Sequence, residues 1–192
     1  GERMSNTLVL LAAATVFVIV IGVGLGIIAA KRRGTRTDRT LVIASMVGWS
    51  LPTFWTGLML IIVFSVTLGW LPVSGITTPG AFYASTWAKI SDIARHLILP
   101  TVSLVIVDMA QFFLVTRSAL VDVLTEDYML TAKGKGLSEN AALNKHALPN
   151  ALLPIITALT LYVCLVIGGA IQVETVFSYP GMGRLMYDAV LK

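Results

Sequence analysis

Three polar side chains lie in or beside long apolar segments, where an ionisable group is costly to place. Asp108 is near the middle of the apolar segment 96–120, and Gln111, three residues on, shares its face of a helix. Such a carboxyl group faces a bundle interior or an aqueous path, where it can meet a cation; a polar contact between helices or a protonated acid is the alternative. Glu174 follows another apolar segment, and both lining a gate and capping a helix remain open for it.

The residues that usually carry catalysis do not occur in productive patterns. The sequence has no G-x-x-x-x-G-K-[ST] phosphate loop, and no Ser/His/Asp set can be placed in one compartment. His96 and His146 are far apart in the chain, and the single cysteine, Cys164, lies in an apolar segment where packing is its expected role. We therefore predict no catalytic residues, no cofactor and no metal site, and any energy source must lie on another chain.

The elements that position these residues are expected to be membrane-spanning helices. Of the 192 residues, 56% are hydrophobic and only 12% are charged, whereas a soluble domain carries about 25% charged residues. Four apolar segments reach the roughly 20 residues that a helix needs to cross a bilayer: 6–30, 41–70, 96–120 and 152–173. We predict one all-α domain over residues 1–192, a polytopic transmembrane helix bundle with four spans and lipid contacts. No basic, aromatic-bearing soluble face indicates a nucleic-acid partner.

The distribution of Lys and Arg between the connecting segments predicts the orientation of the spans. Residues 31–40 hold five bases and the loop 121–149 holds three lysines, whereas residues 71–95 hold two bases. The positive-inside rule then places the first two segments in the cytoplasm and residues 71–95 outside. The final segment, 174–192, and the start of the chain would also lie outside.

Smaller features predict how the spans are packed and connected. The pattern Gly22-x-Gly24-x-Gly26 would let another helix approach the first span closely. Arg117, near the inner end of the third span, is expected to extend to the membrane interface. The outside segment contains several turn-forming residues, with a short helix expected near Trp87.

The cytoplasmic loop 121–149 has the pattern of an ordered helical pair. Residues 126–136 predict a short helix that ends at Gly136, and Ser138 is a plausible N-cap for a second helix leading to the fourth span. Four apolar side chains in the loop would need a partner surface: Tyr128, Met129, Leu130 and Leu137. We therefore interpret the loop as a docking surface, the alternative being a solvated connector.

This loop resembles the "EAA" loop of the permease subunits of ABC importers. The matching intervals are those of Ala132, Gly136, Leu148 and Pro149, whereas Leu130 stands where the family has glutamate and His146 where it has isoleucine. Three longer strings resemble the dipeptide/oligopeptide/nickel branch: Asp127-Tyr128-x-x-Thr131-Ala132-x-x-x-Gly136-Leu137-Ser138, His146-Ala147-Leu148-x-Asn150-Ala151-Leu152-Leu153-Pro154 and Glu174-Thr175-Val176-Phe177-Ser178-Tyr179-Pro180-Gly181-Met182-Gly183-Arg184-Leu185.

The resemblance implies a role for each group of residues. The loop would be a coupling element that docks on a cytoplasmic ABC ATPase, through Asp127, Tyr128, Leu130, Thr131, Ala132, Gly136, Leu137, Ser138, Leu148 and Pro149. Asp108, Gln111 and Glu174 would be candidates for lining the translocation path. The further expected partners are a second permease subunit and an extracytoplasmic binding protein, in the inner membrane of a bacterium or archaeon.

The function implied is ATP-driven import of a small solute, most readily a di- or oligopeptide, or a nickel chelate. Permeases of this family commonly have six spans, so one span would precede Gly1 and one would follow Lys192. An ion-coupled secondary transporter would instead show more intramembrane charges and paired broken helices. An intramembrane enzyme, the other alternative, would need paired reactive residues at one depth.

Overall fold

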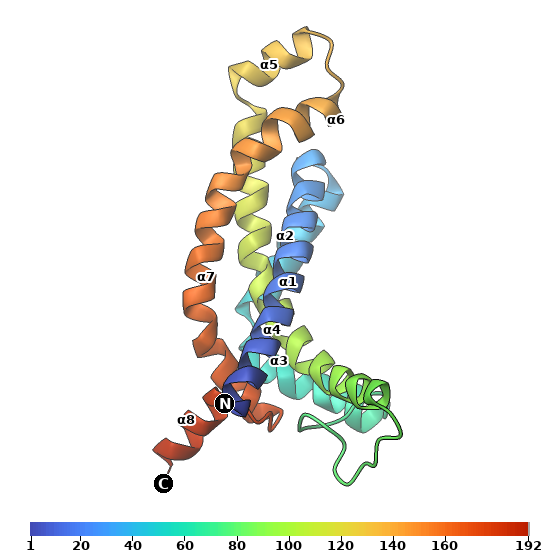
Figure 1. Ribbon diagram of the computed structural model, residues 1–192. Coiled ribbons are helices and arrows are strands. Elements are labelled where there is room, and N and C mark those ends of the chain that lie inside the picture. Colours follow the sequence, from blue (N-terminus) through green and yellow to red (C-terminus); the bar gives the residue numbers. More distant parts are fainter. Residues whose placement is uncertain (192) are drawn as a thin grey trace. The chain divides into compact units, whose positions relative to one another are not determined.

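The computed structural model describes residues 1–191, apart from seven side chains: those of Leu130, Ala132, Lys133, Glu139, Asn140, Gly168 and Gly169. This described part contains helices and no strand (Figure 1), which confirms the all-α prediction. In chain order the helices are α1 (Glu2–Lys31), α2 (Arg36–Ser50), α3 (Thr53–Leu60), the π-helical η1 (Ile61–Thr67), α4 (Thr86–Leu124), α5 (Asp127–Gly134), α6 (Glu139–Ala142), the π-helical η2 (Leu143–Ala147), α7 (Leu148–Val176) and α8 (Met182–Val190).

Three helical stretches of the described chain are long and apolar enough to cross a membrane: α1, α4 and residues 143–167. The segment 41–70, expected as one span, is interrupted, because α2 ends at Ser50 and α3 begins at Thr53. Pro52 explains the interruption: it has no backbone N–H, it is extended with φ −63° and ψ 133°, and it disfavours helical geometry at the preceding residue. The two pieces together are the candidate for a fourth span.

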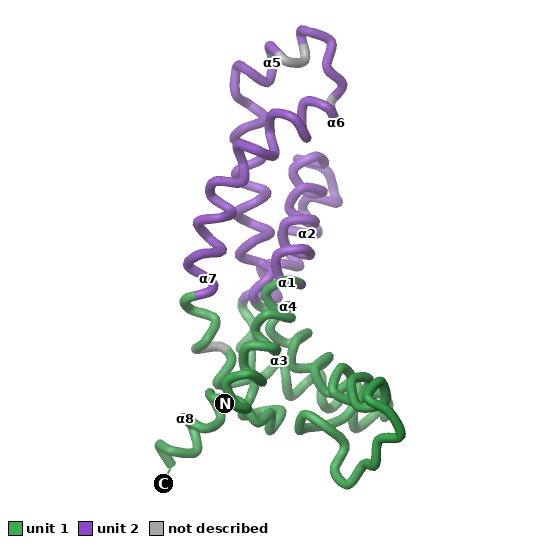
Figure 2. The backbone as a smooth tube through the Cα atoms, viewed as in Figure 1, with its two compact units in different colours: residues 1–16, 50–107, 164–192 green, residues 17–49, 108–163 purple. Residues whose placement is uncertain are grey.

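The chain divides into two compact units, coloured separately in Figure 2. Unit 1 consists of residues 1–16, 50–107 and 164–192, and unit 2 of residues 17–49 and 108–163. The three long helices α1, α4 and α7 each contribute one part to unit 1 and another to unit 2. Each unit is therefore built from segments that are far apart in the sequence.

The core of unit 1 joins the start of α1 to the end of α7. Leu10 of α1, Leu104 of α4 and Val173 of α7 are fully or almost fully buried in one cluster. Phe177 and Tyr179, in the turn after α7, complete this cluster. The turn is thus part of the core and has a defined path into α8.

The loop before α4 is held against that helix by Asp92 of α4. This carboxylate accepts hydrogen bonds from the backbone N–H of Thr78 at 2.7 Å, from its hydroxyl at 2.7 Å and from the Tyr83 hydroxyl at 2.6 Å. The hydrogen bond to Asp92 raises the pKa of Tyr83, because Asp92 accepts the phenol proton and favours the neutral form. The helix expected near Trp87 is the first turn of α4, which begins at Thr86 rather than near His96.

Unit 2 depends on close packing between α1 and α4. A Cβ atom added to Gly22 would lie 2.7 Å from the Met109 carbonyl oxygen, and one added to Gly26 would lie 2.7 Å from the Thr116 Cβ. Only glycine permits this approach, as the spacing predicts. Gly24 faces open space, so two of the three glycines make the contact.

Candidate functional site

The loop between α4 and α7 is anchored inside unit 2 by one side chain. Met129 of α5 is completely buried and packs in a cluster with Leu120 of α4, Leu143 of η2 and Ala151 of α7. Leu137 is partly buried against the same cluster. Met129 therefore packs within the chain, and the expectation that it needs an external partner surface is wrong. For the partly buried Leu137 that expectation stays a prediction. The cluster instead holds the loop in a defined position.

Gly136 and Ser138 set the turn between the two short helices. Gly136 has φ +85°, in the left-handed region that penalises a side chain, and a Cβ added there would contact nothing within 4 Å. The Ser138 hydroxyl accepts the Ala141 N–H at 3.3 Å, which confirms it as the N-cap of α6. The turn is therefore specified by backbone geometry and a cap.

The outer face of the loop carries part of the expected docking set. The exposed members are Asp127, Tyr128, Thr131, Gly136, Ser138 and Pro149. Leu148 is half-buried at the start of α7. The side chains of Leu130 and Ala132 lie outside the described residues. Tyr128, 42% exposed, is the large apolar side chain of the exposed set.

A buried ion pair lies beside this loop in unit 2. The Arg117 Nε and Nη2 atoms donate to the two oxygens of Asp38 at 2.6 and 2.8 Å. The Gly34 N–H also donates to this carboxylate, at 2.9 Å. The Asp38 side chain is only 4% exposed and that of Arg117 27% exposed. Arg117 therefore pairs with the start of α2, and its extension to the membrane interface stays a prediction.

Asp108 makes a contact between two helices of unit 2. The Tyr162 hydroxyl of α7 donates to Asp108 Oδ2 at 2.9 Å, and the Tyr162 ring packs edge-on against Phe112, with ring centroids 5.4 Å apart. Gln111, like Asp108, is half-buried. Within the described chain, Tyr162 is the side chain that bonds this carboxyl group. Both the structural contact and the path-lining role are compatible with this position.

We predict that Asp108→Asn and Tyr162→Phe separate these two roles. Asparagine retains an acceptor for Tyr162 but removes the charge, whereas phenylalanine removes the hydrogen bond and retains the charge. If Asp108 attracts the cationic end of a solute, the asparagine variant loses most uptake and the phenylalanine variant keeps more of it. The measurement is solute uptake per unit of permease in the membrane. Wild-type uptake by Asp108→Asn would exclude an essential charge there.

Glu174 caps a helix in unit 1. Its Oε1 accepts the Thr7 hydroxyl at 2.6 Å, and its Oε2 accepts the Arg184 N–H in the first turn of α8 at 3.0 Å. Thr7 Oγ1 in turn accepts the Met182 N–H at 2.8 Å. Glu174 is completely buried, so this geometry matches the capping interpretation. A gate role for Glu174 stays a prediction.

The turn around Glu174 is closely packed. A Cβ atom on Gly181 would overlap the Glu174 carboxyl group, so this position accepts only glycine without rearrangement. Burial and then the charge of Glu174 raise the pKa of Tyr179 to about 12, and the protonated phenol donates to the Asn6 carbonyl at 3.2 Å. The sequence signal for this arrangement is the Ser178-Tyr179-Pro180-Gly181 turn, which begins four residues after Glu174.

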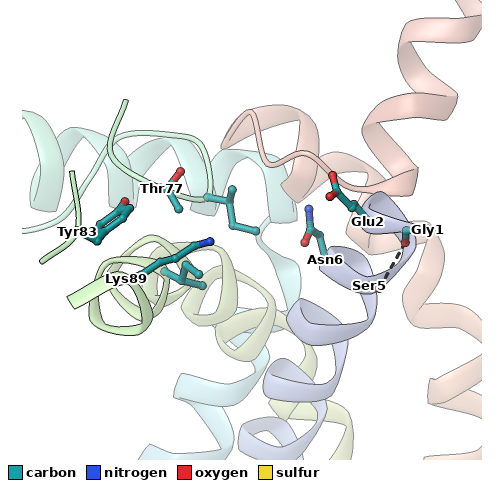
Figure 3. Close-up of a pocket in the computed structure, with 9 residues that line it drawn as sticks. Gly1, Glu2, Ser5, Asn6, Thr77, Tyr83 and Lys89 are labelled. Atoms are coloured by element: carbon teal, nitrogen blue, oxygen red, sulfur yellow. Dashed lines mark hydrogen bonds between the residues drawn. The ribbon is translucent and has the colours of Figure 1, made fainter. Parts of the chain in front are cut away.

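Unit 1 also contains an open cavity of about 800 Å³ between α1 and the loop before α4. Figure 3 shows Tyr83 and Lys89 on one side and Glu2 and Asn6 on the other. The remaining lining residues are Gly1, Ser5, Ile76, Thr77 and Ile93. Glu2 is the acid and Lys89 the base of this lining.

Comparison with known proteins connects these features to a family. The family described as "Binding-protein-dependent transport system inner membrane component" matches residues 22–192. The chain is 42% identical over 190 residues to the "Oligopeptide transport system permease protein AppB" of Bacillus subtilis (strain 168), covering 99% of this chain and 58% of that protein.

Two further relatives are named as permeases for short peptides. The "Di/tripeptide transport system permease protein DppB" of Pseudomonas aeruginosa (strain UCBPP-PA14) is 41% identical over 197 residues, covering 96% of this chain and 59% of that protein. The "Dipeptide transport system permease protein DppB" of Escherichia coli (strain K12) is 37% identical over 204 residues, covering 98% of this chain and 60% of that protein. The chain therefore spans about three-fifths of the length of these relatives. With its long apolar helices and this match over most of its length, the chain belongs to the family of inner-membrane components of binding-protein-dependent transport systems.

Proposed function

We propose that the chain is the membrane-spanning core of a permease subunit in an ATP-driven importer of di- or oligopeptides. The observation that carries the proposal is the identity of about 40% to relatives named as peptide permeases, along nearly the whole chain. The similarity includes the loop 121–149 and the helices on either side of it. Ion-coupled transport and intramembrane catalysis have no comparable support.

The loop between α4 and α7 is the proposed coupling element. Three properties support this role: Met129 anchors it in the core, Gly136 and Ser138 define its turn, and Tyr128 is exposed on it. A rigid element of this kind can pass the motion of an ATPase to the helices it joins. The proposed partners are ABC ATPase subunits at the loop, a second permease subunit and an extracytoplasmic binding protein. In this arrangement the permease itself hydrolyses no ATP.

Reconstitution of the full-length protein tests this function. The permease, its partner permease, the ATPases and the binding protein would be assembled in proteoliposomes, with an ATPase variant unable to hydrolyse ATP as the control. We expect uptake of labelled dipeptide that requires both ATP hydrolysis and the loaded binding protein, and that survives dissipation of ion gradients. Uptake that follows an ion gradient and ignores the ATPase variant would contradict the proposal.

A further inference from the structure

Helix α8 presents an apolar surface to its surroundings. At helical spacing, one arc of the helix carries Met182, Leu185, Met186, Ala189 and Val190. These side chains are exposed; Met186 is 54% and Val190 85% accessible. We call this set the apolar arc of α8. No side chain in it has a hydrogen-bonding group.

The opposite arc of α8 packs on the chain itself. Gly183 is buried so closely that an added Cβ would lie 2.6 Å from the Ile171 Cα of α7. The Arg184 N–H is bonded to the buried Glu174, and the Met182 N–H to Thr7. The rotation of α8 about its axis is therefore fixed, with Gly183 packed against α7 and the apolar arc facing outward. A helix of a water-soluble protein has the reverse arrangement.

We propose that α8 lies in the headgroup layer of the membrane, with its apolar arc among the upper acyl chains. An amphipathic helix that places one face 5–10 Å or so into the acyl boundary has this arrangement of side chains. The helix begins directly after the turn 177–181, which follows the long apolar helix α7, so it starts near the level at which that helix leaves the bilayer. In Figure 1, α8 turns away from the end of α7 instead of continuing it.

Charged side chains next to α8 support a lipid as the molecule that covers its apolar arc. A cavity of about 430 Å³ is lined by Arg3, Ser178, Pro180, Arg184 and Asp188. Arg184 is paired with Asp188 at 3.9 Å, so Arg3 is the arginine of this cavity that forms no ion pair among the described residues. Arg3 and the Ser178 hydroxyl, beside an apolar arc, match a phosphate headgroup above its acyl chains. Protein interfaces carry about one hydrogen bond per 100–200 Å², and the apolar arc has no side chain that could make one.

Spin labels on single cysteines test the proposal in the assembled full-length importer in lipid vesicles. In a Cys164→Ala background, labels at Met186 and Val190 would be compared with labels at Tyr187 and Asp188 on the other arc. We expect collisions with oxygen to exceed collisions with a water-soluble nickel chelate several-fold at Met186 and Val190, and the chelate to dominate at Asp188. Dominant chelate collisions at Met186 and Val190 would overturn the proposal. So would protection of both positions from oxygen as well as from the chelate, because that pattern indicates a protein partner.

The phosphate contact is tested by changing the lipid and one arginine. The thermal stability of the complex would be measured in vesicles of phosphatidylglycerol and, separately, in a neutral glycolipid without phosphate. We expect greater stability with the phospholipid, and loss of this difference in Arg3→Gln, which alters an exposed side chain of the cavity. Equal stability in both lipids, or a difference that Arg3→Gln leaves unchanged, would overturn the headgroup contact.

Discussion

Replacing Gly136 with proline is expected to abolish ATP-driven transport while the permease still reaches the membrane. Gly136 has φ +85°, whereas the proline ring holds φ near −65°. The backbone between α5 and α6 must therefore change its path. The apolar helices lie elsewhere in the chain, so insertion should persist. The expected loss is in the contact with the ATPase, because motion passed between rigid elements depends on their placement.

A graded series at this position distinguishes backbone geometry from side-chain contact. Alanine in the left-handed region costs about 1–2 kcal/mol, and asparagine tolerates this region better. Because a Cβ at Gly136 would contact nothing within 4 Å, the order of damage should follow backbone strain alone: asparagine, then alanine, then proline. Gly134→Ala is the matched control, because Gly134 is helical, exposed and equally free of neighbours. It should transport normally.

Two measurements determine whether the loop is the coupling element. The first is retention of the ATPase when the permease is purified, and the second is stimulation of ATP hydrolysis by loaded binding protein. Gly136→Pro should reduce at least one of them, together with uptake. Normal uptake with full ATPase retention in the proline variant would show that residues 127–138 only connect two helices.

The sequence predicted this loop well where the determinants are local. A glycine after a short helix and a serine before the next are signals that act over a few residues, and both positions have the expected geometry. Met129 shows the limit of such reasoning. From the sequence alone, an apolar side chain in a polar loop can face either a partner protein or the chain's own core. Met129 lies in the core because α4, η2 and α7 pack around it, and the local sequence does not show these contacts.

Contacts between distant segments could not be predicted from spacing. Asp38 and Arg117 are in different parts of the sequence, and nothing in their spacing indicated that they pair. Glu174 was left open between two roles because its partners, Thr7 and the N-terminal turn of α8, depend on the folded arrangement of unit 1. The break in the segment 41–70 is different, because its cause is local. The segment was expected as one span, but Pro52 disfavours an uninterrupted helix at that point.

Removing one partner of the Asp38–Arg117 pair should have the largest effect on the stability of the permease. In Arg117→Gln, a carboxylate that is 4% exposed loses both of its guanidinium hydrogen bonds and retains the Gly34 N–H. Breaking a buried pair costs about 3–5 kcal/mol. We expect the low end of this range, because the Arg117 side chain is 27% exposed and water can partly compensate. Asp38→Ala should cost at least as much, since it also leaves the Gly34 N–H without its acceptor.

Controls within the same segment make this expectation specific to the pair. Arg39→Gln removes an exposed base one residue from Asp38 and should leave stability unchanged. The double variant Asp38→Asn/Arg117→Gln buries no uncompensated charge, so it should recover much of what Arg117→Gln loses. The measurement is the unfolding temperature of the purified permease in one detergent, with its level in the membrane. The single variants of this cycle are Asp38→Asn and Arg117→Gln. If the double variant loses as much stability as these two single variants lose together, Asp38 and Arg117 contribute independently and the pair does not hold α2 against α4.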